Sequence, residues 1–446
     1  MYRNVFDVLH RKKWLVMGQN ETEPRLDPIT GLPTRQDMAK ALDAELAAED
    51  VNGAVMVIGL DNFQLVNEIC GPSVGDEAMR QIAENIANVL PYDITLYQLS
   101  SDQFALYWHD CMPEEMEIVF ASLQLSLRDI AAIEDKIYCT TTAGVAFYPR
   151  DGKDTDTLLR FAQAAKTIGK IEGGGDRICF FNQESYDKWH YRVMMEGLMK
   201  NSIARGCEEF MLYFQPQVRA KDESLYGAEA LLRWRTADGQ ILPPLEFIPV
   251  LEKTRLIIPA GHWIIEKAVE TCKKFQQYIP DFQMSINISL YQLEEQMLYP
   301  FVADCIERHG IDPSTIVFEL TEGQNVTDWE FVNSQFAAFR NLGIKIAMDD
   351  FGSGYATLDF LREFKCDLVK LDRAVILDIL KDDYNKNLVK YSVKLCHAIG
   401  MELCVEGVEE KEVFEFLRDE CEVEKIQGFY FGRPEPEDVF MKRLTK

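Results

Sequence analysis

The second half of the chain constrains the fold most, because short apolar segments alternate there with longer helical patterns. The apolar segments have the length of strands, and the segments between them carry apolar residues at every third or fourth position. Strands that alternate with helices in this way over roughly 240 residues predict a (β/α)8 barrel of the TIM type. The predicted strands are residues 211–215, 228–234, 283–289, 316–321, 344–349, 368–372, 402–406 and 426–431.

Each of these predicted strands carries a polar residue in it or at its end. Because a barrel brings the carboxyl ends of its strands to one mouth, we expect these side chains to meet there, where barrel enzymes have their active sites. Buried carboxylates on one rim need opposite charges or bound cations to be stable together. The polar residues are Gln215, Glu229, Asn287, Glu319, Asp349, Lys370, Glu406 and Gln427.

Two adjacent aspartates, Asp349 and Asp350, end one predicted strand, and a glycine-containing turn at residues 351–354 follows them. Adjacent carboxylates repel each other unless a cation lies between them. The pair therefore predicts a metal site at the mouth of the barrel.

Length, charge and cysteine content exclude several classes of protein. A chain of 446 residues exceeds one compact core, so we expect two domains. The net charge of −26 argues against binding to DNA or to anionic membranes. Eleven cysteines without a Cys-x-x-Cys pair suit a reducing compartment, and no apolar run is long enough to cross a membrane. We therefore expect a cytoplasmic protein without a membrane segment.

The first half also alternates strands with helices, after a lead segment at residues 1–24. Its predicted helices are residues 35–48, 73–90, 113–133 and 155–170, and its predicted strands are residues 54–58, 94–99, 104–108, 137–147 and 177–181. This order, with one antiparallel hairpin through residues 100–103, predicts an α/β domain with a central mixed sheet. A helical pattern at residues 183–206 then connects the two domains, either as a transmitting helix or as a passive tether.

The second half, about residues 195–440, resembles the EAL-domain phosphodiesterases that hydrolyse cyclic di-GMP. The motif that names the family stands as Glu229-Ala230-Leu231. The other matching motifs are Phe214-Gln215-Pro216, Asn287-Ile288-Ser289, Glu319-Leu320-Thr321-Glu322, Asp349-Asp350-Phe351-Gly352, Lys370-Leu371-Asp372, Glu406-Gly407-Val408-Glu409 and Gln427-Gly428. The resemblance implies a barrel with one reversed strand and the hydrolysis of cyclic di-GMP to linear pGpG.

The resemblance also implies a role for each matching residue. Glu229, Asn287, Glu319 and Asp349 are implied to bind one divalent cation, and Asp349 and Asp350 a second. An all-oxygen ligand set fits two Mg²⁺ or Mn²⁺ ions better than Zn²⁺. The implied catalytic residues are Glu406 as a base, Lys370 at the attacking water and Glu322 as the anchor of the loop after Asp350; the implied substrate-binding residues are Gln215, Arg233 and Gln427.

In this family the loop after Asp350 couples dimerisation to metal binding, so the resemblance implies a homodimer through the EAL domains with a regulatory hinge at residues 351–355. One departure from the family is Arg255, which stands where a glycine is usual. No metal-binding or acid–base position is altered. The competing interpretation is a catalytically silent cyclic di-GMP receptor or protein-interaction module.

The first half, residues 25–182, resembles the GGDEF domain of diguanylate cyclases but departs from it at the positions that do chemistry. The signature loop reads Ser100-Ser101-Asp102-Gln103-Phe104, Gly59 stands in place of a metal-binding aspartate, and Gln64 in place of a lysine. These departures imply that the domain does not synthesise cyclic di-GMP. Asn67 and Asp76, with Asp102, leave a candidate site for GTP, although capping and turn roles explain such residues equally well.

Overall fold

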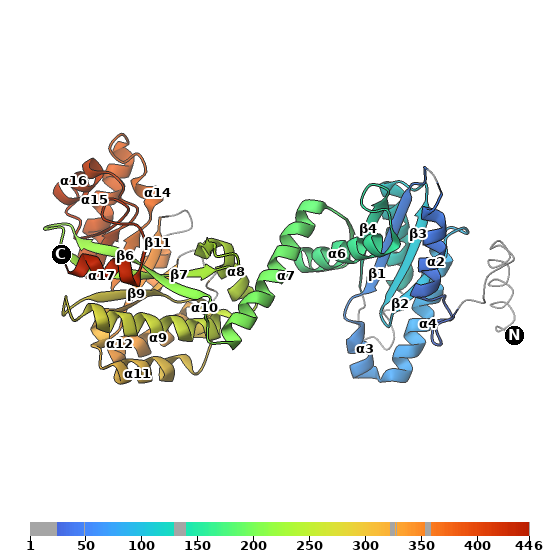
Figure 1. Cartoon of the computed structure of the whole chain (residues 1–446), viewed down its shortest axis with the longest axis horizontal. Coiled ribbons are helices and arrows are strands. Elements are labelled where there is room, and N and C mark those ends of the chain that lie inside the picture. Colours follow the sequence, from blue (N-terminus) through green and yellow to red (C-terminus); the bar gives the residue numbers. More distant parts are fainter. Residues whose placement is uncertain are drawn as a thin grey trace. The chain divides into compact units, whose positions relative to one another are not determined.

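The computed structural model describes residues 25–48, 50–128, 140–321, 326, 328–352 and 358–445 (Figure 1). The chain divides into two compact units between Tyr191 and Arg192. The predicted lead segment, the end of the predicted helix 113–133, the start of the predicted strand 137–147, Glu322 and most of the predicted hinge lie outside the described residues. None of the helices in the described part of the chain combines the length and the apolar character needed to cross a bilayer.

The first unit is a mixed five-stranded sheet in the order β2-β3-β1-β4-β5, with helices on both faces. β1 is antiparallel to both of its neighbours, and β4 is parallel to β5. β1 and β4 are buried along their whole length because helices cover them from two sides, which explains their continuous apolar sequence. The strands are β1 (Gly53–Leu60), β2 (Tyr97–Ser100), β3 (Gln103–His109), β4 (Thr141–Tyr148) and β5 (Ile178–Phe180).

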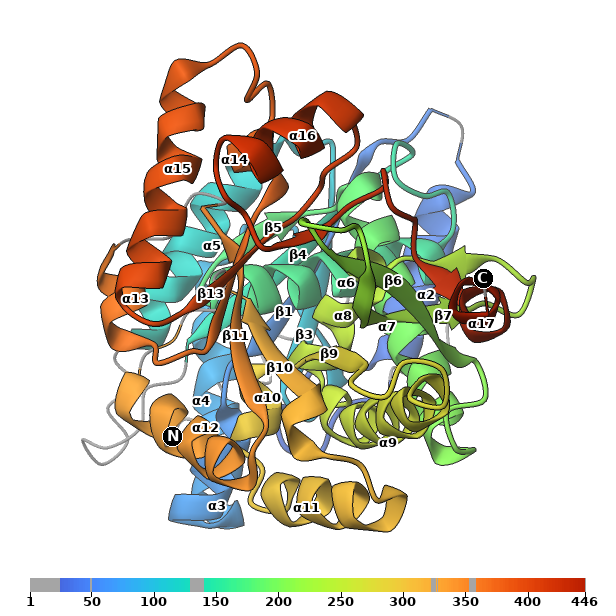
Figure 2. The same cartoon turned by 90° about the vertical axis from the view of Figure 1, so that its left-hand side faces the viewer.

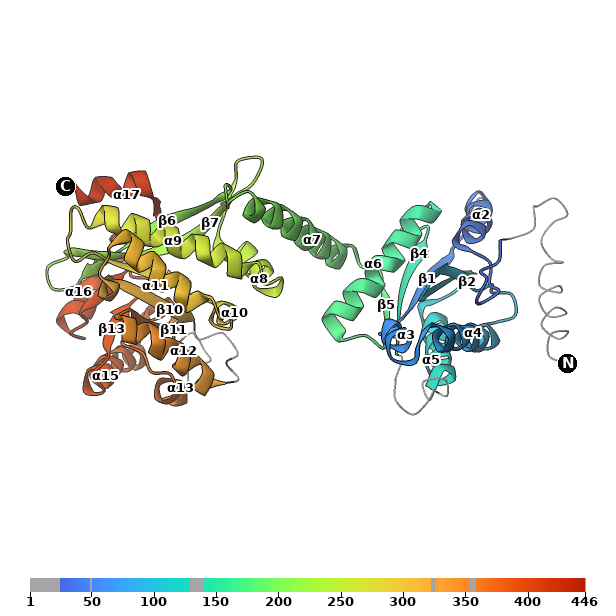
Figure 3. The ribbon, with the colours of Figure 1, turned by 90° about the horizontal axis from the view of Figure 1, so that it is seen from below.

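The two faces of this sheet carry separate hydrophobic cores. Figure 3 shows the helices that cover them, with α4 and α5 on one side of the strands and α2 and α6 on the other. Met56 and Ile58 belong to the core that α4 and α5 cover, whereas Val55 and Val57 belong to the core under α2 and α6. The predicted α/β domain with a central mixed sheet is confirmed. A helix at α3 was not predicted. The helices are α2 (Arg35–Leu46), α3 (Phe63–Cys70), α4 (Pro72–Val89), α5 (Pro113–Arg128) and α6 (Thr155–Gly173). α7 (Gln183–Ala204) begins in this unit and ends in the second.

The second unit is a closed barrel of eight strands (Figure 2). The strands are β6 (Phe210–Arg219), β7 (Leu225–Arg235), β9 (Gln283–Asn287), β10 (Ile316–Thr321), β11 (Lys345–Phe351), β12 (Leu368–Leu371), β13 (Glu402–Val405) and β14 (Lys425–Gln427). β7 and β9–β14 run parallel, whereas β6 is antiparallel to both β7 and β14 and closes the ring. All eight predicted strands and the reversed strand are confirmed.

The helices of this unit lie outside the ring of strands, as Figure 2 shows for α9, α11, α12 and α15. One aromatic cluster joins the reversed strand to the C-terminal helix, because Phe440 lies against the rings of Phe214, Phe275 and Phe282. The helices are α8 (Pro244–Lys253), α9 (Ile257–Phe275), α10 (Leu290–Leu293), α11 (Leu298–His309), α12 (Trp329–Leu342), α13 (Leu358–Glu363), α14 (Arg373–Ile376), α15 (Asp383–Ala398), α16 (Lys411–Asp419) and α17 (Glu437–Leu444); the short strands β8 (Ile241–Leu242) and β15 (Glu435–Pro436) flank the barrel.

Candidate active site

A single lysine lies at the centre of the barrel mouth and contacts four carboxylates. Lys370 is fully buried on β12. Its ammonium nitrogen lies 2.6 Å from Glu406, 2.7 Å from Glu319, 3.0 Å from Asp349 and 3.3 Å from Glu229. The acids come from β7, β10 and β11 and from the residue after β13. The strand ends therefore converge as predicted.

The two adjacent aspartates reach the mouth together because β11 is irregular at its end. Its pairing with β12 shifts between Met348 and Phe351, and Asp350 has a left-handed backbone with φ of 59°. In a regular strand, neighbouring side chains point to opposite faces, and a bulge removes that alternation. Oxygen atoms of Asp349, Asp350 and Glu406 consequently lie within 4.8 Å of one another.

Two amides orient the carboxylate of Glu229. The Asn287 side chain donates a hydrogen bond from Nδ2 to Glu229 Oε1 at 2.8 Å, and Gln427 donates from Nε2 to Glu229 Oε2 at 2.7 Å. Gln427 also donates to Gln215 Oε1 at 3.1 Å. Because the amide nitrogen of Asn287 faces Glu229, the amide oxygen of Asn287 remains as a ligand for a cation.

Burial and like charge shift the pKa values of the acids upward. Burial, reinforced by neighbouring acids against the opposing Lys370, raises the pKa of Glu319 to about 8. Burial and then the Asp349 charge raise the pKa of Asp350 to about 6, and the pKa of Glu406 lies well above its usual range for similar reasons. These carboxylates need more positive charge than one lysine supplies.

Burial also acts on Glu229 and Lys370, but their neighbours outweigh it. The pKa of Glu229 lies below its usual value, because the Lys370 ammonium and the two amide donors overcome the effect of burial. The pKa of Lys370 is raised, because the surrounding carboxylates overcome the burial that alone would lower it. Glu229 is thus held ionised and Lys370 protonated.

Several carboxylate oxygens in this cluster are suited to a hard cation. Glu319 Oε1 is buried and meets no donor at hydrogen-bond geometry among the described residues. Asp349 Oδ1 and Glu406 Oε1 face the Lys370 ammonium, at 3.0 and 2.6 Å. Oxygens of Glu229, Glu319 and Asp349 also lie within 4.8 Å of one another. Carboxylate oxygens are the ligands that Mg²⁺ and Mn²⁺ take, and four acids share one ammonium here, so the residues fit the expected cations.

Of the remaining predicted site residues, Arg233 and Gln215 lie close to this cluster. The guanidinium of Arg233, which is on β7, lies 5.4 Å from the centroid of the Tyr213 ring, and Nη1 donates to the Leu232 carbonyl at 2.8 Å. Gln215 on β6 is paired in register with Glu229. Glu322 lies outside the described residues.

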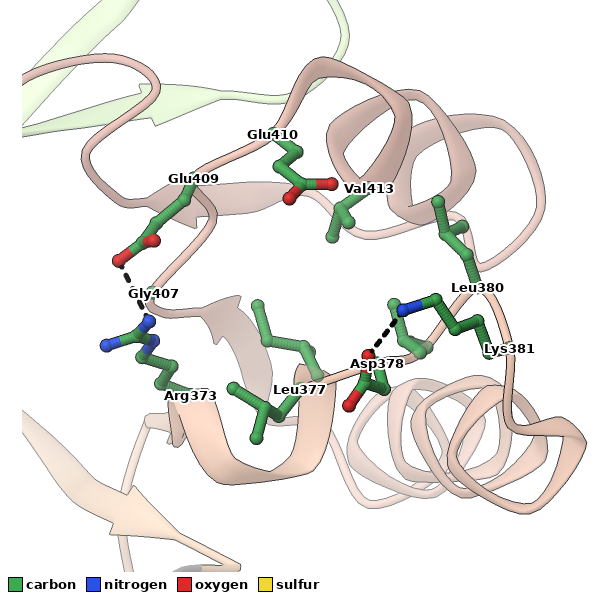
Figure 4. A pocket seen from close by; sticks show the side chains of 11 residues that line it. Arg373, Leu377, Asp378, Leu380, Lys381, Gly407, Glu409, Glu410 and Val413 are labelled. Carbon is green, nitrogen blue, oxygen red and sulfur yellow. Dashed lines mark hydrogen bonds and ion pairs between the residues drawn. The ribbon is translucent and has the colours of Figure 1, made fainter.

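A pocket of about 330 Å³ lies beside the loop that follows Glu406, between α14 and α16 (Figure 4). Gly407 has φ of 70°, and a Cβ there would lie 2.4 Å from the Cβ of Arg373. Arg373 in turn pairs with Glu409 at 3.1 Å. A side chain at position 407 would displace Arg373, so the glycine allows the loop that carries Glu406 to close against α14.

Arg255, the departure noted in the sequence, has a left-handed backbone with φ of 61°. Its guanidinium pairs with Glu294 and lies 4.5 Å from the centroid of the Tyr291 ring. These side-chain contacts hold a conformation that glycine adopts more readily.

The candidate nucleotide residues of the first unit do not form a comparable cluster. Asn67 Oδ1 packs against the backbone of α4, because a Cβ on Gly75 would lie within 1.8 Å of it. Asp76 is exposed on α4, and Asp102 lies in the turn before β3, where it accepts from Ser100 Oγ at 3.3 Å. These contacts are those of packing and turn residues.

A lysine occupies the space beside Gly59 in the first unit. A Cβ on Gly59 would lie 2.9 Å from Lys166 Nζ. Lys166 is only 7% exposed, burial lowers its pKa, and no acid of the described residues lies within ion-pair distance of it. Lys170 on the same helix pairs with the buried Asp61 at 2.9 Å. Neither lysine was predicted from the sequence, although their spacing of four residues on α6 was a signal.

The sequence analysis also missed Gln217, a buried residue of β6 that donates to Gln427 Oε1 at 2.9 Å. The signal was available, because Gln217 follows Gln215 by two residues and alternate residues of a strand share a face.

Comparisons with known proteins cover both units. Residues 200–434 match the EAL domain family, and residues 25–175 match the GGDEF domain of diguanylate cyclases. The cyclic di-GMP phosphodiesterase PdeR of Escherichia coli (strain K12) is 29% identical over 418 residues, which are 93% of this chain and 62% of PdeR. The bifunctional diguanylate cyclase/cyclic di-GMP phosphodiesterase MucR of Pseudomonas aeruginosa is 28% identical over 429 residues, which are 94% of this chain and 61% of MucR.

Two solved structures share the fold. The PaMucR phosphodiesterase in its c-di-GMP complex is 28% identical with a TM-score of 0.51, and the match covers 55% of this chain and 99% of that chain. The EAL enzyme Bd1971 in its cAMP-bound form is 26% identical with a TM-score of 0.55, covering 71% of this chain and 86% of that chain. The chain spans 52% to 62% of the length of the first curated relatives it matches.

Proposed function

This chain belongs to the EAL domain family, with a GGDEF domain in tandem, and on that premise we propose that its barrel hydrolyses cyclic di-GMP to linear pGpG with Mg²⁺ or Mn²⁺. The observation that carries the proposal is the convergence of four carboxylates on Lys370: three are buried, Glu406 is partly buried, and one oxygen of Glu319 lacks a hydrogen-bond donor among the described residues. The relatives named for phosphodiesterase activity support the choice of substrate.

The acids would form two neighbouring cation sites. Glu229, Asn287, Glu319 and Asp349 would hold one ion, and Asp349 with Asp350 the other, supported by Glu406 and Gln427. The two groups of acids that share Asp349 support this assignment, since each has oxygens within 4.8 Å of one another. A bound pair of cations would supply the positive charge that activates water and offsets charge on the phosphate.

The chain's own residues would position the substrate and move the protons. As water forms its bond to phosphorus, the bond from phosphorus to the 3′ oxygen breaks, the 3′ oxygen takes up a proton from solvent to leave as a hydroxyl, and one proton must leave the water. Glu406 would accept that proton, because a carboxylate whose pKa is raised by burial is a better base. Lys370 would hold the water and the acids in place, and Arg233 would bind phosphate oxygens.

The GGDEF domain would be non-catalytic, which Lys166 in the space beside Gly59 supports. A regulatory role through GTP is testable by calorimetry with GTP and Mg²⁺. No binding at high micromolar GTP would end that idea.

A homodimer through the EAL domains is supported by an exposed apolar stripe on α15. The stripe consists of Tyr384, Leu388, Tyr391 and Leu395. Asp383 at the start of the helix pairs with Lys386 of the same helix at 2.9 Å, so the apolar stripe would carry the contact when a second copy of α15 packs antiparallel to it. In that pairing the first residue of the stripe faces the last, and the two middle residues face each other.

Light scattering on the full chain tests this interface. Tyr391→Glu should lower the molar mass from dimer to monomer, whereas Leu245→Glu, at an 89% exposed position on α8, should leave it unchanged. A wild-type monomer, or a Tyr391→Glu dimer, would contradict the assignment.

The activity is tested by incubation with cyclic di-GMP and Mn²⁺, followed by separation of the products. We expect pGpG from the wild type and more than about 100-fold less from Glu229→Ala, which lacks a metal ligand. Glu402→Gln is the matched control, because that acid begins β13 and pairs with Lys425 at 2.6 Å. Unchanged substrate with tight binding would favour the receptor interpretation, and near-normal activity of Glu229→Ala would show that the site is assigned wrongly.

A further inference from the structure

A chain of three buried side chains runs from the interior of the barrel to the EAL-motif glutamate. Gln217 is 2% exposed and Gln427 is 3% exposed. Gln217 Nε2 donates to Gln427 Oε1 at 2.9 Å, and Gln427 Nε2 donates to Glu229 Oε2 at 2.7 Å. Gln217 therefore reaches the candidate metal cluster through one intermediate residue and without touching it.

The reversed strand β6 brings Gln217 into this position. Because alternate residues of a strand share a face, Gln215 and Gln217 both point into the barrel. In register, Gln215 is paired with Glu229, and Gln217 is paired with Gln427 across the other edge of β6. Gly227 leaves room for the side chain, since a Cβ there would lie 3.2 Å from Gln217 Oε1.

The hydrogen bond from Gln217 selects one of the two orientations of the Gln427 amide. A side-chain amide can rotate by half a turn, which exchanges its donor and acceptor ends. In the observed orientation the carbonyl of Gln427 accepts from Gln217 while its nitrogen donates to Glu229 and Gln215. The rotated amide would place a carbonyl against the Glu229 carboxylate and a donor against the Gln217 donor, so that both contacts would be lost.

The orientation of Gln427 in turn sets the orientation of Glu229. The amide holds Oε2 from one side, and Asn287 holds Oε1 at 2.8 Å from another. Partners of this kind, which orient a ligand without binding the metal, commonly change metal affinity by about 10- to 100-fold when they are lost.

We propose that Gln217 is a positioning residue that raises the affinity of the EAL barrel for its divalent cation by holding Gln427 in the orientation that orients Glu229. The proposal rests on the proposed function, because it takes Glu229 as a ligand of that cation. It assigns Gln217 no contact with substrate.

The test measures Mn²⁺ binding to the full chain without substrate, by the loss of the electron paramagnetic resonance signal of free Mn²⁺. Gln217→Met removes the donor at similar length and should weaken binding by about 10-fold. Gln217→Glu should weaken it at least as much, because a carboxylate cannot donate to the Gln427 carbonyl. Gln276→Met is the matched control, since Gln276 is a hydrogen-bonded amide of the same unit that contacts Phe282 and Thr315 instead.

A double-mutant cycle separates positioning from a general loss of packing. If Gln217 acts through Gln427, then Gln217→Met should have no further effect on Mn²⁺ affinity in a Gln427→Met background. Additive losses, or a Gln217→Met affinity within twofold of the wild type, would overturn the proposal. At saturating Mn²⁺ the KM of Gln217→Met for cyclic di-GMP should equal that of the wild type.

The outcomes for this proposal and for the proposed function are distinguishable. A wild type that binds Mn²⁺ but leaves cyclic di-GMP intact would refute the hydrolytic function, and the binding series would still decide the role of Gln217. A wild type that binds no Mn²⁺ would overturn both.

Discussion

Replacement of Lys370 by methionine should destabilise the metal-free barrel strongly, because three buried carboxylates and the partly buried Glu406 would lose their shared cation. The ammonium nitrogen lies between 2.6 and 3.3 Å from all four acids, and the side chain is fully buried. Removal of one partner from a buried ion pair usually costs about 3–5 kcal/mol of folding free energy. Methionine has a similar length and no charge, so the change in packing is small.

Protonation of the acids limits this loss. At pH 7, protonation of a carboxyl with a pKa near its usual value costs about 3.4 kcal/mol. For Glu319 this cost is smaller, because burial raises its pKa to about 8. We therefore expect Lys370→Met to lower the free energy of unfolding by about 3–5 kcal/mol in the absence of divalent cations.

The dependence of this loss on pH has a definite sign. Without the lysine, the remaining buried acids have raised pKa values, so the folded variant binds more protons than the unfolded chain. The stability of the variant therefore rises as the pH falls from 7 to 5, and its deficit against the wild type shrinks. Above pH 7 the deficit grows.

Hydrogen exchange of β10–β13, measured in EDTA with increasing urea, reports on the barrel alone. The matched control is Lys345→Met, because Lys345 begins β11, is partly exposed and approaches Glu402 only at 3.9 Å. Mn²⁺ at 100 times its dissociation constant should raise the free energy of unfolding of Lys370→Met by about 2.7 kcal/mol. A variant within 1 kcal/mol of the wild type in EDTA, where about 3 is expected, would refute the view that Lys370 neutralises the cluster.

Three further perturbations test other features. Asn287→Asp replaces the amide that donates to the EAL-motif glutamate at 2.8 Å by an acid that repels it. The unfolding temperature of this variant in EDTA should be lower than that of the wild type, and Mn²⁺ should raise this temperature by more than it does in the wild type. Gly59→Asp should form an ion pair with Lys166 Nζ, which lies 2.9 Å from the added Cβ, and an assay with GTP and Mg²⁺ should detect no cyclic di-GMP. A hydrogen bond from Arg308 lowers the pKa of Glu266 to about 2, so the stability lost in Glu266→Gln should be largest above about pH 4.5 and shrink as pH falls toward 2 in urea titrations. An equal loss at pH 7 and pH 3 would contradict this assignment.

Much of the barrel could be predicted from the sequence because each of its parts is encoded locally. A strand buried on both faces needs a continuous apolar run, and an outer helix needs one apolar stripe. The polar residues at the strand ends could then be expected to meet at the barrel mouth, since parallel strands bring their carboxyl ends together. All eight meet, through Lys370 or through the amides of Gln427 and Asn287; Gln215 joins them by accepting from Gln427.

Contacts between distant residues were not predictable in the same way. Whether the space beside Gly59 is filled depends on α6, which is about 100 residues later in the chain, and Lys166 fills it. The link from Gln217 to Gln427 joins residues separated by 210 positions. Such contacts depend on which strands become neighbours and in which register.

The sequence by itself determined the fold class and the identity of the groups at the barrel mouth, because local patterns decide where strands and helices form and motifs decide which side chains end them. The tertiary structure decided how those groups face one another. The bulge at Asp350 turns two neighbouring aspartates to the same side, and the reversed β6 places Gln217 below Gln427. The physical reason is that the direction of a side chain depends on the pairing and regularity of its strand, which long-range contacts set.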